Sequence, residues 1–172
     1  MNSHLQCPTF KMLLMPFCFF VCTLALYIPV SAQEKPPRPI VIKVETARHL
    51  EFGTIVPTND SGGSVTVDIS GNQTPSGYVF IVPSGGLGKS ALFQVYVIPG
   101  TLITINQIPD SKIYNGSFFM NLELGVPSTG YVFITKDDPT DVFIGGKLTI
   151  GSMADNPAGA YIGYFNVTFN QQ

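Results

Sequence analysis

The chain has 172 residues, of which 45% are hydrophobic and 12% charged, and its formal net charge is −2. A chain of this length can bury one sizeable core, so a single domain is expected. The sequence has no basic face for nucleic acid and no charge run for another polyelectrolyte partner.

Residues 1–32 have the pattern of a secretory signal peptide. Lys11 precedes the apolar run "MLLMPFCFFVCTLALYIPV", and "VSAQ" follows with small residues at the positions that a signal peptidase requires. The expected cleavage lies between Ala32 and Gln33. An uncleaved membrane anchor is the alternative, because the run is long enough to span a bilayer. The two prolines within the run favour the signal peptide.

Cleavage would remove every cysteine, because all three lie within residues 1–32. The expected mature chain is therefore exported without a disulfide, and its core alone must stabilise it. It keeps eight basic against eleven acidic residues, a net charge of −3.

Residues 33–39, "QEKPPRP", are Pro-rich and charged, which predicts an extended arm. Residues 40–172 are expected to form one domain after it. The strands expected there, in chain order, are residues 40–44, 49–56, 64–69, 77–82, 91–98, 101–105, 117–124, 130–135, 147–150 and 160–169.

Segment 64–69 shows the strand pattern most clearly. Val65, Val67 and Ile69 would lie on one face, and Thr66 and Asp68 on the other. This two-residue period is typical of a half-buried strand. Loops rich in Gly, Pro, Asn and Asp separate the expected strands, and no window shows helical periodicity. About ten short strands predict an all-β fold, an immunoglobulin-like sandwich of antiparallel sheets, with a closed barrel as the alternative.

The expected last strand runs almost to the end of the chain. Its core face would carry Tyr161, Gly163, Phe165, Val167 and Phe169, which would fix its register. The best candidate for its partner is segment 40–44, from the same chain or from another one.

The loop "PSGGLGKS", residues 83–90, ends like a phosphate-binding loop. Such a loop needs glycine where Pro83 stands, and it needs a helix after the Lys-Ser pair. A strand is expected there instead, so a plain turn with a solvated Lys89 is favoured.

The loop "KDDPTD" holds three acidic residues, Asp137, Asp138 and Asp141. Calcium favours several carboxylates on one loop, so these residues are a weak candidate site. Their spacing does not match an EF-hand, and Pro139 favours an ordinary turn.

Catalytic groups are scarce. The expected mature chain has no cysteine nucleophile, and His49 is its one imidazole, so a metal site with two histidines cannot form. A paired-carboxylate hydrolase would have to use Glu45, Glu51 or Glu123. Because Glu45 and Glu123 occupy polar positions of alternating strands, exposure to solvent is the favoured interpretation. We expect no enzymatic activity and no cofactor.

Two stretches of the chain resemble a known family. The opening motif is "LEFGTIVP", residues 50–57, and the closing motif, residues 146–169, contains "KLTIG" and "NPAGAYIGYFNVTF". Together they resemble a family of secreted bacterial proteins, the domain of unknown function 4402, or DUF4402. The resemblance implies a signal peptide followed by one pilin-like β-sandwich, located in the periplasm, on the outer surface or outside the cell. It implies no catalytic residues.

Two functions are compatible with these observations. In the first, the chain is a structural or adhesive surface subunit, and Ile40, Ile42 and Val44 form a strand that adds to the sheet of a neighbouring subunit. The alternative within this hypothesis is that this segment folds back onto its own domain. In the second, the chain is a monomeric module that binds a glycan or a protein through its loops. Nucleic acid is not expected as a partner, nor is a membrane span after signal removal.

Overall fold

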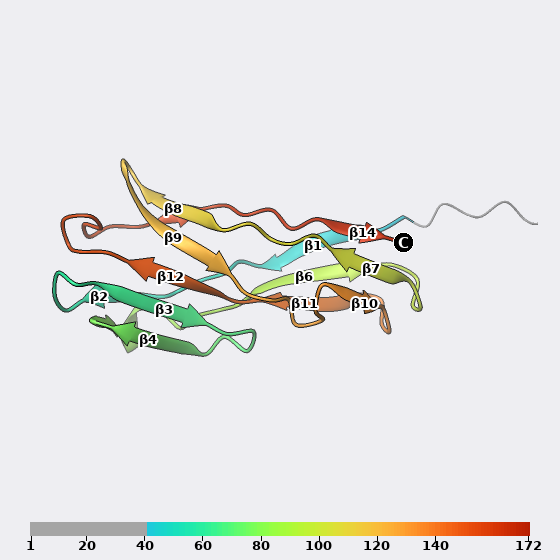
Figure 1. Ribbon diagram of the computed structural model, residues 1–172. Coiled ribbons are helices and arrows are strands. Elements are labelled where there is room, and N and C mark those ends of the chain that lie inside the picture. Colours follow the sequence, from blue (N-terminus) through green and yellow to red (C-terminus); the bar gives the residue numbers. More distant parts are fainter. Residues whose placement is uncertain (1–40) are drawn as a thin grey trace, which may run out of the picture. The chain divides into compact units, whose positions relative to one another are not determined.

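The computed structural model describes residues 41–172, which form an elongated all-β body (Figure 1). The predicted all-β fold is confirmed, since these residues contain strands and one short 3-10 turn, η1 (Pro83–Gly85), but no α-helix. The strands are β1 (Lys43–Arg48), β2 (Ile55–Pro57), β3 (Gly63–Val67), β4 (Gln73–Gly77), β5 (Val79–Ile81), β6 (Ala91–Tyr96), β7 (Leu102–Ile105), β8 (Ser111–Asn115), β9 (Phe118–Leu124), β10 (Val132–Ile134), β11 (Thr140–Ile144), β12 (Gly146–Ile150), β13 (Ile162–Gly163) and β14 (Phe169–Gln171).

Two three-stranded sheets lie in the half of the body that contains the C-terminus. One has the order β1-β6-β11 and the other β10-β7-β14, and all their pairs are antiparallel. A core cluster joins them, with Val95, Ile103, Val142 and Ile144 fully buried. Each of these residues is β-branched, the type that packs best on a pleated surface.

The other half contains a six-stranded antiparallel sheet, β13-β8-β9-β12-β3-β4, and the two-stranded sheet β2-β5. A second core cluster lies here, built on Val65, Leu122 and Leu148. β11 leads into β12 with one residue between them, so the chain passes directly from one sheet to another (Figure 1). The chain crosses between the two halves several times, since β1, β6, β7, β10, β11 and β14 lie in one half and the other strands lie in the other.

The final segment differs from the single strand that the sequence predicts. It forms two short strands, of which β13 pairs with β8 and β14 with β7. The predicted pairing with the first strand of the same chain is wrong, because β1 pairs with β6 and the last strands pair with β8 and β7. The predicted alternation of faces is confirmed from Tyr161 to Phe169, and the rings of Phe165 and Phe169 pack on Phe93 at centroid distances of 6.3 and 5.9 Å.

The first described residues pair and pack within their own domain. Val44 lies opposite Val95 in the β1–β6 pair, and Ile42 packs against the buried cluster of that half. In this structure the segment therefore folds back onto its own domain, which is the alternative interpretation. Ile40, the arm of residues 33–39 and the predicted cleavage at Ala32 and Gln33 lie outside the described residues.

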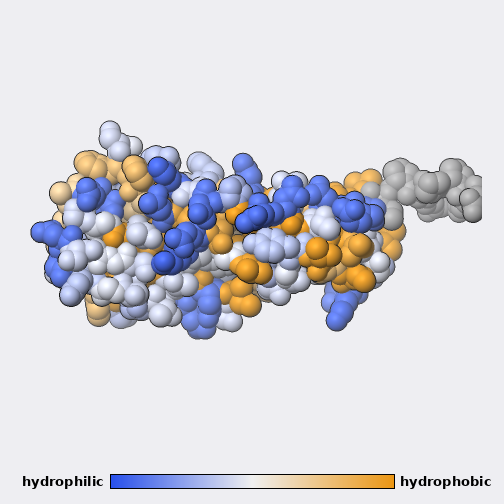
Figure 2. Space-filling model, in the orientation of Figure 1, coloured by the Kyte–Doolittle hydropathy of each residue, from blue (hydrophilic) through white to orange (hydrophobic). Residues whose placement is uncertain are grey.

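Several exposed apolar side chains lie at the surface, among hydrophilic ones (Figure 2). Val132 and Ile134 of β10 are each about 60% exposed. Within residues 41–172, no helix has the length and apolar character needed to cross a membrane.

Candidate functional site

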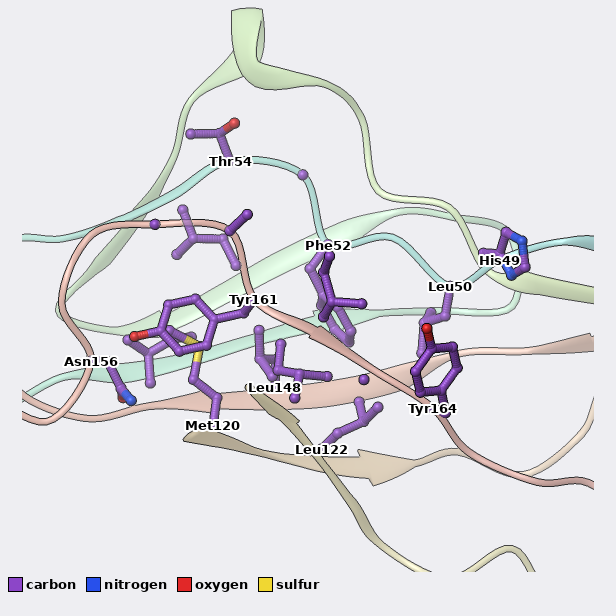
Figure 3. A pocket seen from close by; sticks show the side chains of 18 of the residues that line it. His49, Leu50, Phe52, Thr54, Met120, Leu122, Leu148, Asn156, Tyr161 and Tyr164 are labelled. Carbon is purple, nitrogen blue, oxygen red and sulfur yellow. The ribbon is translucent and has the colours of Figure 1, made fainter. Parts of the chain in front are cut away.

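An open groove of about 1120 Å³ lies in the half that contains the six-stranded sheet. One wall is the stretch from Arg48 to Pro57, and the other is residues 156–165. The floor consists of inward-facing sheet residues, among them Met120, Leu122 and Leu148. Figure 3 shows Phe52 and Tyr161 beside these floor residues.

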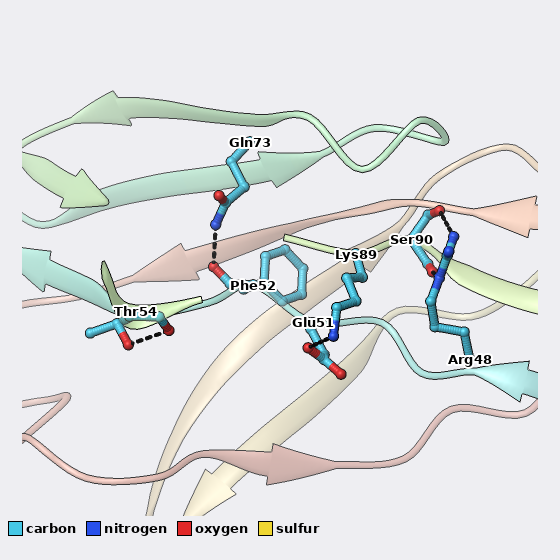
Figure 4. A network of polar contacts seen from close by, with 8 residues as sticks. Arg48, Glu51, Phe52, Thr54, Gln73, Lys89 and Ser90 are labelled. Carbon is cyan, nitrogen blue, oxygen red and sulfur yellow. Dashed lines mark hydrogen bonds and ion pairs between the residues drawn. The ribbon is translucent and has the colours of Figure 1, made fainter. Parts of the chain in front are cut away.

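Polar contacts fix the back of the first wall (Figure 4). The Arg48 guanidinium donates to the Ser90 carbonyl at 2.8 Å and to its hydroxyl at 3.0 Å. Glu51 and Lys89 exchange both backbone hydrogen bonds, and their side chains form an ion pair at 2.9 Å. These contacts attach the first wall to residues 89 and 90, which lead into β6. The apolar side chains of the wall are thereby held towards the groove.

The centre of this wall depends on a glycine. Gly53 has a φ of 69°, and an added Cβ would lie 2.5 Å from the Gly86 carbonyl oxygen. The Gln73 amide donates to the Phe52 carbonyl at 2.8 Å, and the Thr54 hydroxyl donates to the Gly85 carbonyl at 2.9 Å. Only glycine allows this bend together with this close approach.

The second wall is anchored by the side chain of Asn156, which is 7% exposed. Its carbonyl oxygen accepts from the Gly151 amide at 2.6 Å, and its NH₂ group donates to the Phe119 carbonyl at 2.8 Å. The Tyr161 hydroxyl donates to the Pro157 carbonyl at 2.9 Å. These bonds close the turn before β13 and orient the Tyr161 ring at the groove.

The lining of the groove is poor in reactive groups. Arg48 and His49 are the ionisable residues of its lining apart from two tyrosines, and Arg48 is engaged by Ser90. An apolar groove of this kind binds apolar surface and offers no paired acid and base.

The model of one family, described as Domain of unknown function (DUF4402), matches residues 42–170. The chain belongs to the DUF4402 family. No curated protein and no solved structure gives a significant match. Both family motifs lie at the groove of this DUF4402 domain, since the opening motif forms much of the first wall and the closing motif supplies floor residues and the second wall.

The three aspartates of the weak calcium site do not converge in the DUF4402 domain. Within the described part of the chain, no group of three or more acidic, histidine or cysteine side chains is arranged to hold a metal ion. The Asp141 carboxylate instead accepts a hydrogen bond from Gln94 at 3.2 Å, and the Asp137 carbonyl accepts one from the Thr140 hydroxyl.

The three glutamates considered for hydrolysis are placed apart, and each faces a lysine. Glu45 contacts Lys43 at 2.6 Å, Glu51 contacts Lys89, and Glu123 lies 3.7 Å from Lys147. The hydrogen bond that the Lys43 ammonium donates to the Glu45 carboxylate lowers the pKa of Glu45 and raises the pKa of Lys43. A lowered pKa makes Glu45 a poorer proton donor at neutral pH.

The loop at residues 83–90 has no phosphate-binding geometry, because strand β6 follows it where a helix would be needed. Lys89 pairs with Glu51 at 2.9 Å, and its side chain is 49% exposed, in agreement with the predicted solvent-exposed lysine. The sequence contained a signal for the groove in its two motifs. It could not show that they face each other, because no local pattern links segments about a hundred residues apart.

Proposed function

We propose that this DUF4402 protein is a non-enzymatic structural subunit of the cell envelope, exported by its signal peptide. Its copies associate when an extended segment of one enters the groove of the next. The observation that carries the proposal is the open apolar groove, which the aromatic rings of Phe52 and Tyr161 line together with sheet residues such as Met120 and Leu148.

Two unpaired strand edges support the proposal that an extended segment occupies the groove. β2 pairs only with β5, and β13 pairs only with β8, so each has one unpaired edge among residues 41–172. Extended peptides bind such edges through main-chain hydrogen bonds, and their alternate side chains fill the pockets between. A helix would use its backbone bonds internally and gain nothing from these edges.

The occupant that we infer is residues 33–40 of a second copy, "QEKPPRPI". Pro-rich segments bind aromatic-lined grooves with a small entropic cost, because proline restricts the free chain to extended conformations. Ile40 would add one apolar side chain. Ile42 and Val44, included in the candidate strand-exchange segment, belong to their own domain and are left out of the exchange.

The position of the described N-terminus supports contact between copies. Residue 41 and the C-terminus lie at one end of the body, whereas β2 and the turn before β13 lie towards the other end (Figure 1). Eight residues extend over about 27 Å at most. A head-to-tail arrangement brings the arm of one copy to the groove of the next.

The test is the size of the processed chain, residues 33–172, compared with a chain that starts at residue 41. We expect the processed chain to form larger species in size-exclusion chromatography and the shortened chain to be monomeric. A length-matched variant with Pro36, Pro37 and Pro39 replaced by Ser should also be impaired. Equal monomers from all three chains would overturn the proposal.

A second pair of variants tests the groove itself. Ala160 is exposed and lines the groove, whereas Ala154 is exposed but lies outside its lining. Ala160→Trp should place a bulky ring in the groove and reduce association, and Ala154→Trp should leave association unchanged. If both variants associate like the parent chain, the groove is not the contact site.

A further inference from the structure

A second groove, of about 680 Å³, lies beside β13, β8 and β9. Its outward-facing side chains combine aromatic and polar groups, with Tyr114 and Tyr164 as the aromatic ones. Tyr164 is 88% exposed and Tyr114 is 50% exposed. Two tyrosine rings so open to water at one groove mark a candidate binding surface.

The backbone beneath these rings is held in place. The Ser111 hydroxyl donates to the Tyr164 carbonyl at 2.8 Å, and Ile162 lies opposite Tyr114 in the β13–β8 pair. The Tyr114 ring also packs on Phe119 at a centroid distance of 6.3 Å. The Tyr114 ring therefore projects from the paired strand β8, and the Tyr164 ring from a backbone segment that Ser111 holds, which lowers the cost of ordering them when a ligand binds.

Polar side chains lie within reach of the same rings. Asp110, Lys112, Asn121 and Glu123 line the groove together with the tyrosines. The Lys112 ammonium sits 3.8 Å from the centre of the Phe119 ring. The Glu123 carboxylate is 3.7 Å from Lys147, and its side chain is 53% exposed. Carboxylate and amide oxygens accept hydrogen bonds from hydroxyl groups, and amide and ammonium groups donate to them.

We propose that this groove binds a neutral saccharide. A pyranose ring has an apolar C–H face, which packs on an aromatic ring, and a rim of hydroxyls that both donate and accept. Two tyrosine rings beside carboxylate, amide and ammonium groups match both properties. The groove holds two carboxylates and one ammonium, and Lys147 lies 3.7 Å from the Glu123 carboxylate, so the groove has no excess of positive charge to attract phosphorylated, sulfated or sialylated ligands.

The saccharide site is distinct from the loop-borne site that the sequence suggested, because its rings come from β8 and the strand-edge segment after β13. It also goes beyond the proposed association of copies. Tyr114 lines only the second groove, whereas Tyr164 borders both. Tyr114 is therefore the residue that separates the two functions in an experiment.

The test is an array of immobilised neutral and acidic oligosaccharides, probed with the purified chain and with two variants. We expect binding to at least one neutral oligosaccharide. Tyr114→Ala should weaken that binding about tenfold or more. Tyr78→Ala is the matched control, because Tyr78 is 55% exposed and lies outside both grooves, and it should bind like the parent chain.

Three results would overturn the inference: no neutral oligosaccharide bound, binding to acidic oligosaccharides only, or equal binding by Tyr114→Ala and the parent chain. Size-exclusion chromatography of Tyr114→Ala distinguishes a failure of saccharide binding from a failure of the proposed association between copies. The variant should form the same larger species as the parent chain. Circular dichroism should show the parent spectrum, so that a loss of binding reflects the ring and not the fold.

Discussion

A few buried polar contacts position the walls of the large groove, and Asn156 is the clearest of them. Its side chain is almost fully buried, and it bonds to the Gly151 amide, the Phe119 carbonyl and the Asp155 carbonyl. The sequence placed Asn156 in a turn, but nothing local showed that its amide reaches back to the start of β9. That contact depends on how distant segments pack.

We expect Asn156→Ala to lower the free energy of unfolding by about 2 kcal/mol, because it leaves buried backbone groups without partners. Asn166→Ala is the matched control. Asn166 is exposed on the outward face of the last segment, and its loss should change stability by less than about 0.5 kcal/mol. Urea denaturation of both variants measures the difference, and equal stabilities would show that the Asn156 bonds contribute little.

Gly53 allows a separate test of the first wall. Gly53 and Gly116 have similar positive φ angles, 69° and 60°, but only at Gly53 would a Cβ meet the main chain of another segment. We expect Gly116→Ala to cost about 1 kcal/mol of stability from its backbone conformation alone, and Gly53→Ala about 3 kcal/mol. Thermal unfolding compares the two. Equal losses would mean that the close approach to Gly86 does not restrict the residue.

At the scale of strands, the sequence predicted those whose side chains face a core. Val65 and Val67 are buried as the alternation indicates, whereas Ile69 lies beyond the end of β3 and is 45% exposed. Three strands lie where loops or no strand were predicted, namely β4, β8 and β11. β4 is an edge strand that contains Pro75, so it needs neither an apolar face nor every ladder hydrogen bond.

The sequence did not predict β8 and β11, and the reasons are related. β8 is mostly polar, and its pairing with β9 defines it as a strand. β11 follows the acidic loop, and its pairing with β6 buries Val142 and Ile144. Local composition indicates a strand when one face is apolar, but pairing with a distant strand can impose the same structure on a polar segment. The groove depends on such distant pairing, so only its motifs could be seen in the sequence.

The turn between β3 and β4 gives a prediction at this scale. The Asp68 carboxylate accepts hydrogen bonds from the Asn72 side chain and from the Ser70 and Asn72 amides, which lower its pKa. A lowered pKa in the folded state stabilises the protein above the ordinary aspartate pKa, about 3.9, and this contribution is lost as the pH falls through the folded value.

We therefore expect Asp68→Asn to be less stable than the parent chain at pH 7 and to approach it as the pH falls below about 3.9. Chemical denaturation across this range measures the gap. Asp60→Asn, in the preceding turn, is the control for the general effect of removing one carboxylate. A gap for Asp68→Asn that stays constant with pH would contradict the role of the carboxylate.

At the scale of the whole molecule, facing sheets enclose the core in one half of the domain, whereas the other half contains an open groove. Two facing sheets enclose the cluster around Val95 and Ile103, whereas the cluster around Leu122 and Leu148 borders the groove. An apolar groove of this kind is a candidate binding site. An arm at one end and a groove towards the other would allow copies to join in series, which is a heterologous contact that can extend indefinitely.

Disulfide cross-linking tests this account most directly. Residues 33–172 contain no cysteine, so a chain carrying Ile40→Cys and Ala160→Cys reports contact between the arm and the groove without background. A disulfide requires Cα atoms within about 7 Å. The account predicts a ladder of covalent oligomers under oxidising conditions, with each single-cysteine variant giving dimers at most. A double variant that stays monomeric, or an equal ladder from Ile40→Cys with Ala154→Cys, would contradict it.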